Sequence, residues 1–176
     1  MGKKLLIVVD MQKDFVDGAL GTKEAQAMLP NLEKKLAQFD GEVIFTQDTH
    51  PKNYLQTQEG KGLPVPHCII GTPGWQLVPS LQKWAMAHHS QIFEKPTFGS
   101  VKLADALRVE EAKEPFEFIE LVGLCTDICV ISNALLLKAA MPEVVIKVDP
   151  TCCAGVTPEK HKAALAVMSS CQIAIE

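Results

Sequence analysis

An acid, a lysine and a thiol lie far apart in the sequence, each after an apolar run. Asp10 follows LLIVV, Lys95 follows QIFE, and Cys129 lies in the segment GLCTDIC that follows FIELV. A carboxylate can act as a general base and a thiolate as a nucleophile. If the apolar runs are strands of one parallel sheet, their carboxyl ends share the edge where ligands bind in such sheets. The three residues therefore indicate a cysteine nucleophile at that edge.

Cys129 lies where a strand is expected to give way to an apolar helix over residues 126–140. Thr126 or Asp127 is well placed to cap this helix. In a first helical turn, unpaired backbone N–H groups and the positive end of the helix dipole stabilise a thiolate. The same N–H groups can hold an oxyanion. A cysteine in an apolar helix is more often inert packing, so the prediction depends on the acid and the lysine lying nearby.

A second group of residues has the donor types that transition metals bind. Asp48 and His50 form an Asp-x-His motif after the second apolar run, and His67 ends the motif LPVPH. One carboxylate and two imidazoles suit zinc, iron or manganese and leave positions for water or substrate. Without a metal, His50 would be a loop residue and Asp48 a turn cap. The spacing alone leaves both interpretations open.

The elements that must position these residues alternate between strand and helix along the chain. Apolar and β-branched runs predict strands, and helical periodicity predicts the segments between them. The predicted strands are 5–9, 43–46, 91–93, 116–122, 144–148 and 172–175, and the predicted helices are 30–39, 80–87, 101–109, 126–140 and 158–169. Several strands are apolar almost throughout, as in parallel sheets covered on both faces. We therefore predict an α/β fold, a three-layer α/β/α sandwich with a mainly parallel sheet of about six strands, in a single domain over residues 1–176.

Other features complete the expected arrangement. Asp149, after the run VVIKV, is also expected at the carboxyl end of a strand, and residues 48–72 form a long irregular stretch of the kind that is usually functional. Of the six cysteines, the four outside the GLCTDIC segment are expected to be small buried hydrophobic residues, namely Cys68, Cys152, Cys153 and Cys171. His88 and His89 are expected to be solvated at a helix end.

Composition limits the class of partner. The formal net charge of −4 gives no basic field for a phosphate backbone, so nucleic acid is a poor candidate. No run is long and apolar enough for a membrane helix, and we expect neither a signal peptide nor an anchor, because the apolar stretch 5–9 ends on the charged Asp10. We therefore expect reduced thiols, a cytoplasmic location and a small-molecule substrate.

The strings VVDMQKDF around Asp10, EKPTFGS around Lys95 and GLCTDICV around Cys129 resemble the signature of the isochorismatase-like cysteine hydrolases, and the resemblance runs in order through the whole chain. This superfamily includes nicotinamidases, N-carbamoylsarcosine amidases and isochorismatases. The resemblance implies that Asp10 is the acid and base, Lys95 its electrostatic partner and Cys129 the nucleophile. It also implies an oxyanion hole built from the backbone amides of Cys125 and Cys129, with a cis peptide bond between Leu124 and Cys125.

The same resemblance bears on the metal and the substrate. Asp48, His50 and His67 match the metal ligands of nicotinamidases, and Glu59 matches a further acidic ligand or water-mediated contact. Phe15 matches an aromatic residue that packs on the substrate ring, although it could equally belong to the core. Because isochorismatases lack this metal set, the resemblance favours nicotinamide as the substrate, a divalent metal (zinc first, then iron or manganese) as the cofactor, and a homo-oligomer.

The expected reaction is hydrolysis of a small amide through a thioester, with Lys95 lowering the pKa of both acidic partners. Another small amide, or isochorismate, is the alternative substrate within the enzyme class. A flavodoxin-like binding module is a non-enzyme alternative, but the residues after the first strand are DMQKDF and not a glycine-rich phosphate loop. A catalytically silent relative would be expected to have lost one of the three site residues.

Overall fold

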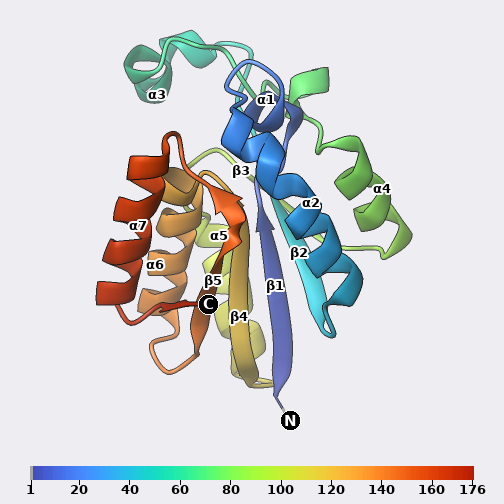
Figure 1. The fold of residues 1–176 in the computed structure, drawn as a ribbon, viewed down its shortest axis with the longest axis vertical. Helices are drawn as coiled ribbons and strands as arrows, with labels where there is room; N and C mark the ends of the chain where they lie inside the picture. Colours follow the sequence, from blue (N-terminus) through green and yellow to red (C-terminus); the bar gives the residue numbers. More distant parts are fainter. Residues whose placement is uncertain (1) are drawn as a thin grey trace.

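Six parallel strands form the central sheet in a computed structural model that describes residues 2–176 (Figure 1). Met1, the first residue of the predicted domain, lies outside the described residues. The strands are β1 (Lys3–Val9), β2 (Glu42–Asp48), β3 (Ile92–Lys95), β4 (Phe116–Leu124), β5 (Ile146–Ala154) and β6 (Ala174–Ile175). Their order is β3-β2-β1-β4-β5-β6, and every neighbouring pair is parallel. The predicted six-stranded parallel sheet is confirmed.

Helices cover both faces of this sheet (Figure 1). The longer helices are α2 (Lys23–Gln38), α4 (Pro79–Ala87), α5 (Val101–Glu111), α6 (Ile131–Ala140) and α7 (Pro158–Ser170), and the short ones are α1 (Lys13–Val16) and α3 (Gln58–Gly62). Tyr54–Gln56 and Pro73–Trp75 form 3-10 turns, and Thr126–Val130 forms a π-helical turn before α6. None of the helices in residues 2–176 is both long and apolar enough to cross a membrane.

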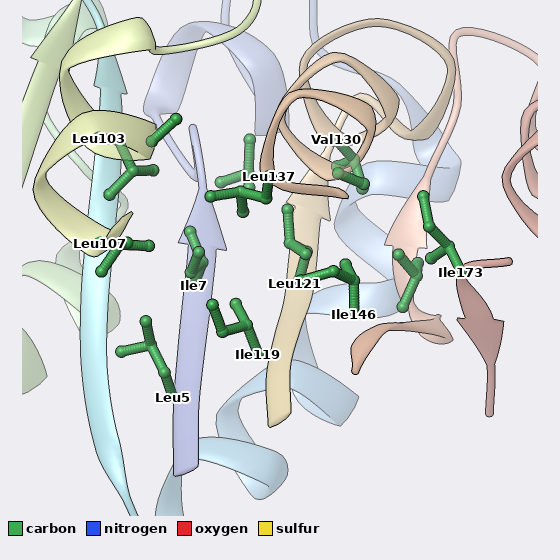
Figure 2. Packing of buried hydrophobic residues seen from close by; sticks show 14 of the residues in the cluster. Leu5, Ile7, Leu103, Leu107, Ile119, Leu121, Val130, Leu137, Ile146 and Ile173 are labelled. Carbon is green, nitrogen blue, oxygen red and sulfur yellow. The ribbon is translucent and has the colours of Figure 1, made fainter. Parts of the chain in front are cut away.

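The alternation of side chains along β1 divides the core into two halves. Leu5 and Ile7 belong to the cluster under α5, α6 and α7, which Figure 2 shows from close by. Leu6 and Val8 belong to the cluster under α2 and α4. Successive side chains of a strand point to opposite faces, so a strand that is apolar throughout serves both halves of the core. The three-layer α/β/α prediction is confirmed.

The strand order places the reactive residues beside one another. The chain runs from β1 outward to β2 and β3, then returns to β4 on the other side of β1 and runs outward to β5 and β6. Ligands bind where the direction of the strand order reverses, beyond the carboxyl ends of the strands. Here that point lies between β1 and β4, so the segment after Val9 and the segment after Leu124 are neighbours.

The start of α2 differs from the prediction, which began the helix at Pro30. The helix begins seven residues earlier by its bounds, at Lys23, where the side chain of Thr22 accepts a hydrogen bond from the Ala25 amide. Pro30 lies inside the helix and removes one backbone donor. Burial of the face that carries Ala25, Met28, Leu32 and Leu36 offsets that loss.

β5 also differs, because it does not end before Asp149 but continues to Ala154. Its pairing with β4 jumps from Leu121 opposite Val148 to Gly123 opposite Cys153, and this irregularity accommodates Pro150 inside the strand. Asp149 therefore lies within the strand. Its carboxylate is 2.7 Å from the Lys35 Nζ of α2, so the expectation that Asp149 joins the other strand-end residues is wrong.

Smaller differences concern the loop and the cysteines. Residues 48–72 are not irregular throughout, since they contain Tyr54–Gln56 and α3. Cys171 is exposed because it caps the carboxyl end of α7, contrary to the prediction of burial. Cys68, Cys152 and Cys153 are buried as predicted. His88 ends α4, also as predicted.

Candidate active site

Asp10, Lys95 and Cys129 come together beyond the carboxyl ends of β1, β3 and β4. The Lys95 Nζ lies 2.6 Å from Asp10 Oδ2 and 3.5 Å from Cys129 Sγ. The three residues are 0%, 1% and 4% exposed. Lys95, whose type alone would suggest a surface charge, is thus an internal cation between a carboxylate and a thiol.

Neighbouring groups fix the acid and the lysine. The Thr46 hydroxyl donates a hydrogen bond of 2.6 Å to Asp10 Oδ1, and Asp10 has a φ of 48°. The Lys95 ammonium also donates to the Thr97 carbonyl at 3.0 Å and to Asp48 Oδ1 at 3.4 Å. A left-handed aspartate is uncommon outside turns and functional sites, where surrounding contacts hold it. Neither threonine was singled out from the sequence, because neither carries a local pattern.

Burial dominates the protonation of this group. Burial raises the pKa of Asp10, with the charge of Asp48 adding to the rise and Lys95 opposing it. Burial also raises the pKa of Cys129 well above its usual value, and the charge of Lys95 again opposes the rise. Burial acts to lower the pKa of Lys95, but the charges of Asp10, Cys129 and Asp48 raise it overall. Lys95 lowers the pKa of both acidic partners, as predicted, but desolvation by burial outweighs its charge, so both pKa values are raised overall.

The segment that carries Cys129 begins with the cis peptide bond between Leu124 and Cys125, as the resemblance implied. Cys129 then lies in the π-helical turn that precedes α6, and not in a regular first turn of an α-helix. Single π-turns are frequent at functional sites. The predicted capping is wrong in both cases: the Thr126 hydroxyl lies 2.7 Å from the His161 imidazole, and Asp127 accepts from the Val156 amide. Both side chains tie the turn to the start of α7.

Asn133 is a residue of this site that the sequence did not reveal. Its side-chain amide donates to the Cys129 carbonyl at 2.8 Å and to the Phe98 carbonyl at 3.1 Å, and its oxygen accepts from the Ser100 amide at 2.9 Å. Asn133 is buried. The only available signal was an amide residue within an otherwise apolar helix. Its three bonds hold the turn of Cys129 against the loop after Lys95.

The four residues proposed as metal ligands also come together. One donor atom from each of Asp48, His50, Glu59 and His67 lies within 4.8 Å of all the others. His50 Nε2 is 2.9 Å from Asp48 Oδ2 and 3.5 Å from Glu59 Oε1, and His67 Nε2 is 3.7 Å and 3.8 Å from the same two oxygens. Tetrahedral zinc with ligands about 2.0–2.2 Å away needs donor separations of about 3.3–3.6 Å. The donor set therefore fits a divalent metal.

The orientation of His67 supports this fit. Its Nδ1 lies 2.8 Å from the Val65 carbonyl, and its Nε2 is the nitrogen that lies near the carboxylates of the cluster. A metal-binding histidine is commonly fixed in this way by a carbonyl on its other nitrogen. The buried Tyr54 lies beside both imidazoles, and its hydroxyl donates to the Leu63 carbonyl. Tyr54 thereby holds the segment that carries Leu63 close to the two histidines.

Members of both clusters line one cavity of about 280 Å³. Its wall includes Asp48, Glu59 and His67 from the metal group and Cys129 with Cys125 from the catalytic segment. The remaining wall is mostly apolar, and its side chains include Phe15, Leu20, Leu63, Phe98, Ile128 and Val156. An apolar cavity with a few convergent polar groups is the usual form of a small-molecule site.

Phe15, whose role was left open between substrate contact and core, lines this cavity. Its ring centroid is 5.4 Å from that of His67. A flat apolar side chain beside the metal group can pack against a ring bound there. Asp48 also joins the two clusters, because its Oδ2 faces His50 while its Oδ1 faces Lys95.

Comparison with known proteins shows the family of this chain. The sequence model of the Isochorismatase domain matches residues 4–175. An isochorismatase family protein of Bacillus subtilis is 31% identical over 143 residues, covering 76% of this chain and 77% of that protein. A nicotinamidase/pyrazinamidase of Mycobacterium tuberculosis is 30% identical over 146 residues, covering 74% of this chain and 76% of that protein.

A solved structure extends the similarity over the whole fold. The pyrazinamidase of Pyrococcus horikoshii, determined in complex with zinc, superposes with a TM-score of 0.81 at 27% identity, covering 99% of this chain and 98% of that chain. The matched residues 4–175 include both clusters of the cavity. The chain belongs to the isochorismatase family.

Proposed function

We propose that this protein is a nicotinamidase, which hydrolyses nicotinamide to nicotinate and ammonia through a thioester on Cys129. The observation that carries the proposal is that the Cys129 thiol, which lies beside Lys95 and its partner Asp10, lines the same small cavity as Asp48, Glu59 and His67 of the four-donor metal group. Nicotinamide has a ring nitrogen and a carboxamide on one flat ring, so one molecule can meet both clusters. The similarity to a nicotinamidase/pyrazinamidase and to a zinc-bound pyrazinamidase supports the same substrate class.

The metal site would orient the ring. A divalent metal held by Asp48, His50, Glu59 and His67 supplies, when bound, a Lewis acid for the ring nitrogen. Zinc is our first candidate, with iron and manganese as alternatives. Phe15 lies on the wall beside His67, where it can pack against the ring. The carboxamide would then lie toward Cys129, at the other end of the same cavity.

The first half of the proposed reaction forms the thioester. Asp10 takes the proton of the Cys129 thiol, and the thiolate attacks the amide carbon. The backbone amides of Cys125 and Cys129 hold the resulting oxyanion. Asp10 then returns the proton to the departing nitrogen, which leaves as ammonia. A carboxyl with a raised pKa suits this task because it must both accept and donate a proton near neutral pH.

The second half releases the product. Asp10 takes a proton from a water molecule, which attacks the thioester carbon, and the proton passes to the Cys129 sulfur as nicotinate departs. Lys95 remains charged throughout, because the negative groups around it raise its pKa. Its ammonium therefore stabilises whichever of Asp10 and Cys129 is negative at each stage.

Ammonia release tests the proposal. The purified protein should release ammonia from nicotinamide and from pyrazinamide, and dialysis against a chelator should reduce both rates until zinc is restored. Release from an aliphatic amide of similar size should be far slower, because such an amide lacks a ring nitrogen. If nicotinamide is inert while isochorismate is cleaved, the substrate assignment is wrong. Activity that is undiminished in chelator would remove the metal from the proposal.

The proposal also covers the setting of the enzyme. Residues 1–176 would form one isochorismatase-like domain, which the match over residues 4–175 supports. A thiol nucleophile beside a second thiol at position 125 functions best in a reducing compartment, which favours the cytoplasm. The expected homo-oligomer stays a prediction, and light scattering of the purified protein would measure its mass.

A further inference from the structure

Gln12 contacts the metal group without belonging to it. This fully buried side chain accepts a hydrogen bond from the Asp48 amide at 2.7 Å and donates one to the Asp48 carbonyl at 2.8 Å. The same nitrogen donates to the Trp75 carbonyl at 2.8 Å. The two-point contact with Asp48 fixes the backbone on both sides of its side chain. Gln12 therefore fixes the position of the Asp48 backbone from which the carboxylate extends.

Asp14, two residues later, contacts the other end of the metal group. Its Oδ2 accepts a hydrogen bond of 2.8 Å from the amide of Cys68, the residue after His67. Its carboxylate lies against Gly74, where a Cβ atom would overlap the two Asp14 oxygens. Glycine at position 74 thus leaves the room in which the Asp14 carboxylate lies.

The segment that carries both side chains is itself held in place. The backbone amide of Gln12 donates to the backbone carbonyl of Asp10 at 2.7 Å, and the backbone amide of Phe15 donates to the backbone carbonyl of Gln12 at 3.1 Å. The segment therefore spans the catalytic acid, the aromatic wall and both ends of the metal group. No contact of Gln12 or Asp14 involves an atom that would take part in the reaction.

We propose that the side chains of Gln12 and Asp14 together form a brace for the metal group. This brace sets the separation of Asp48 and His67 and so determines the affinity of the site for a divalent metal. The proposal rests on the proposed metal dependence of the enzyme. Asp48 ends a strand and His67 lies in a long loop, and a backbone bridge between His50 and Ile69 joins the two segments. The brace adds a second connection, in which one short segment contacts the backbone at Asp48 and at Cys68.

The expected effect is on metal affinity and not only on folding. Partners outside the ligand shell typically contribute about 10- to 100-fold in metal affinity. We therefore expect Gln12→Ala to weaken zinc binding by about tenfold or more. Asp14→Ala should weaken zinc binding as well. Asp14→Asn keeps an acceptor for the Cys68 amide, so it should retain most of the wild-type zinc affinity.

Gln47 offers a matched control. It is also buried, lies next to Asp48 in the chain, and donates a 2.8 Å hydrogen bond to the same Trp75 carbonyl as Gln12. It makes no side-chain contact with Asp48 in the described hydrogen-bond network. Gln47→Ala removes one buried side-chain hydrogen bond where Gln12→Ala removes three, so it should lower the melting temperature by less than Gln12→Ala does, and it should bind zinc like the wild type.

The experiment measures zinc dissociation constants by competition with a chromophoric chelator, and melting temperatures of the same metal-free proteins. The brace is supported if Gln12→Ala and Asp14→Ala weaken zinc binding while Gln47→Ala does not. It is overturned if Gln47→Ala weakens binding equally, or if neither brace variant differs from the wild type. Should Gln12→Ala fail to fold, the partly exposed Asp14 and its Ala and Asn variants decide the question alone.

The result separates this inference from the proposed function. If the wild type binds zinc and the brace variants bind it equally well, the brace is ruled out and the nicotinamidase proposal stays intact. A wild-type protein that does not bind zinc overturns the brace and the metal dependence together. Ammonia release from nicotinamide by the metal-free protein would then show whether the amidase survives without them.

Discussion

Replacing Asn133 by alanine should damage both the stability and the turnover of this protein. The substitution removes three buried hydrogen bonds, to the carbonyls of Cys129 and Phe98 and from the amide of Ser100. A typical buried hydrogen bond contributes about 1 kcal/mol net, and more when its partner is left unsatisfied. We therefore expect Asn133→Ala to lower the free energy of unfolding by about 3 kcal/mol. At about 2–4 °C per kcal/mol, the melting temperature should fall by about 6–12 °C.

The effect on rate follows from the same contacts. The Cys129 carbonyl that Asn133 holds belongs to the turn carrying the nucleophile, and a misplacement of about 1 Å can cost about 100-fold in rate. The assay combines urea unfolding with ammonia release at saturating nicotinamide, where kcat should fall by about tenfold or more. Asn31→Ala is the control, because Asn31 makes a single exposed bond to the Thr151 carbonyl and should cost under about 0.5 kcal/mol. Equal losses in the two variants, or an unchanged kcat in Asn133→Ala, would refute this reasoning.

Four further substitutions test the catalytic segment and the fold. Cys129→Ala should abolish turnover with the fold intact by circular dichroism, whereas Cys125→Ala should keep substantial activity because position 125 contributes its backbone. Hydrogen bonds from Lys35 and Thr151 outweigh burial and lower the pKa of Asp149 below 3.8, so its ionised form stabilises the fold above that value. The cost of Asp149→Asn, measured by urea unfolding, should be full at pH 7 and vanish as the pH falls through the lowered pKa. Gly123→Ala should cost more than about 2 kcal/mol in the same assay, because φ is 115° and a Cβ would overlap a β1 carbonyl.

The convergence of Asp10, Lys95 and Cys129 could be predicted because it depends on one property of parallel sheets. Residues that follow apolar strands lie at a common edge whatever the detailed strand order. The metal group was less predictable, because the spacing of Asp48, His50 and His67 left a loop histidine and a turn cap equally open. The resemblance to nicotinamidases favoured the metal and added Glu59, and the structure brings the four donors together.

The failures have a different physical origin. Asp149 was misplaced because the apolar run VVIKV ends just before it, whereas the pairing with β4 carries β5 past Asp149 through an irregular register. The pKa values of Asp10 and Cys129 depend on burial, which only the packed structure sets. Gln12 and Asn133 act through bonds to segments distant in the sequence, and no local pattern encodes such partners.

The central claim is that nicotinamide acylates Cys129. Rapid acid quenching of enzyme mixed with excess nicotinamide, followed by peptide fragmentation in a mass spectrometer, measures which side chain carries the acyl group. We expect a nicotinoyl group on the Cys129 sulfur that appears within the first turnover and is absent from Cys129→Ala. A nicotinoyl group on Cys125, or nicotinate formed at full rate with no acylated cysteine at any quench time, would contradict it.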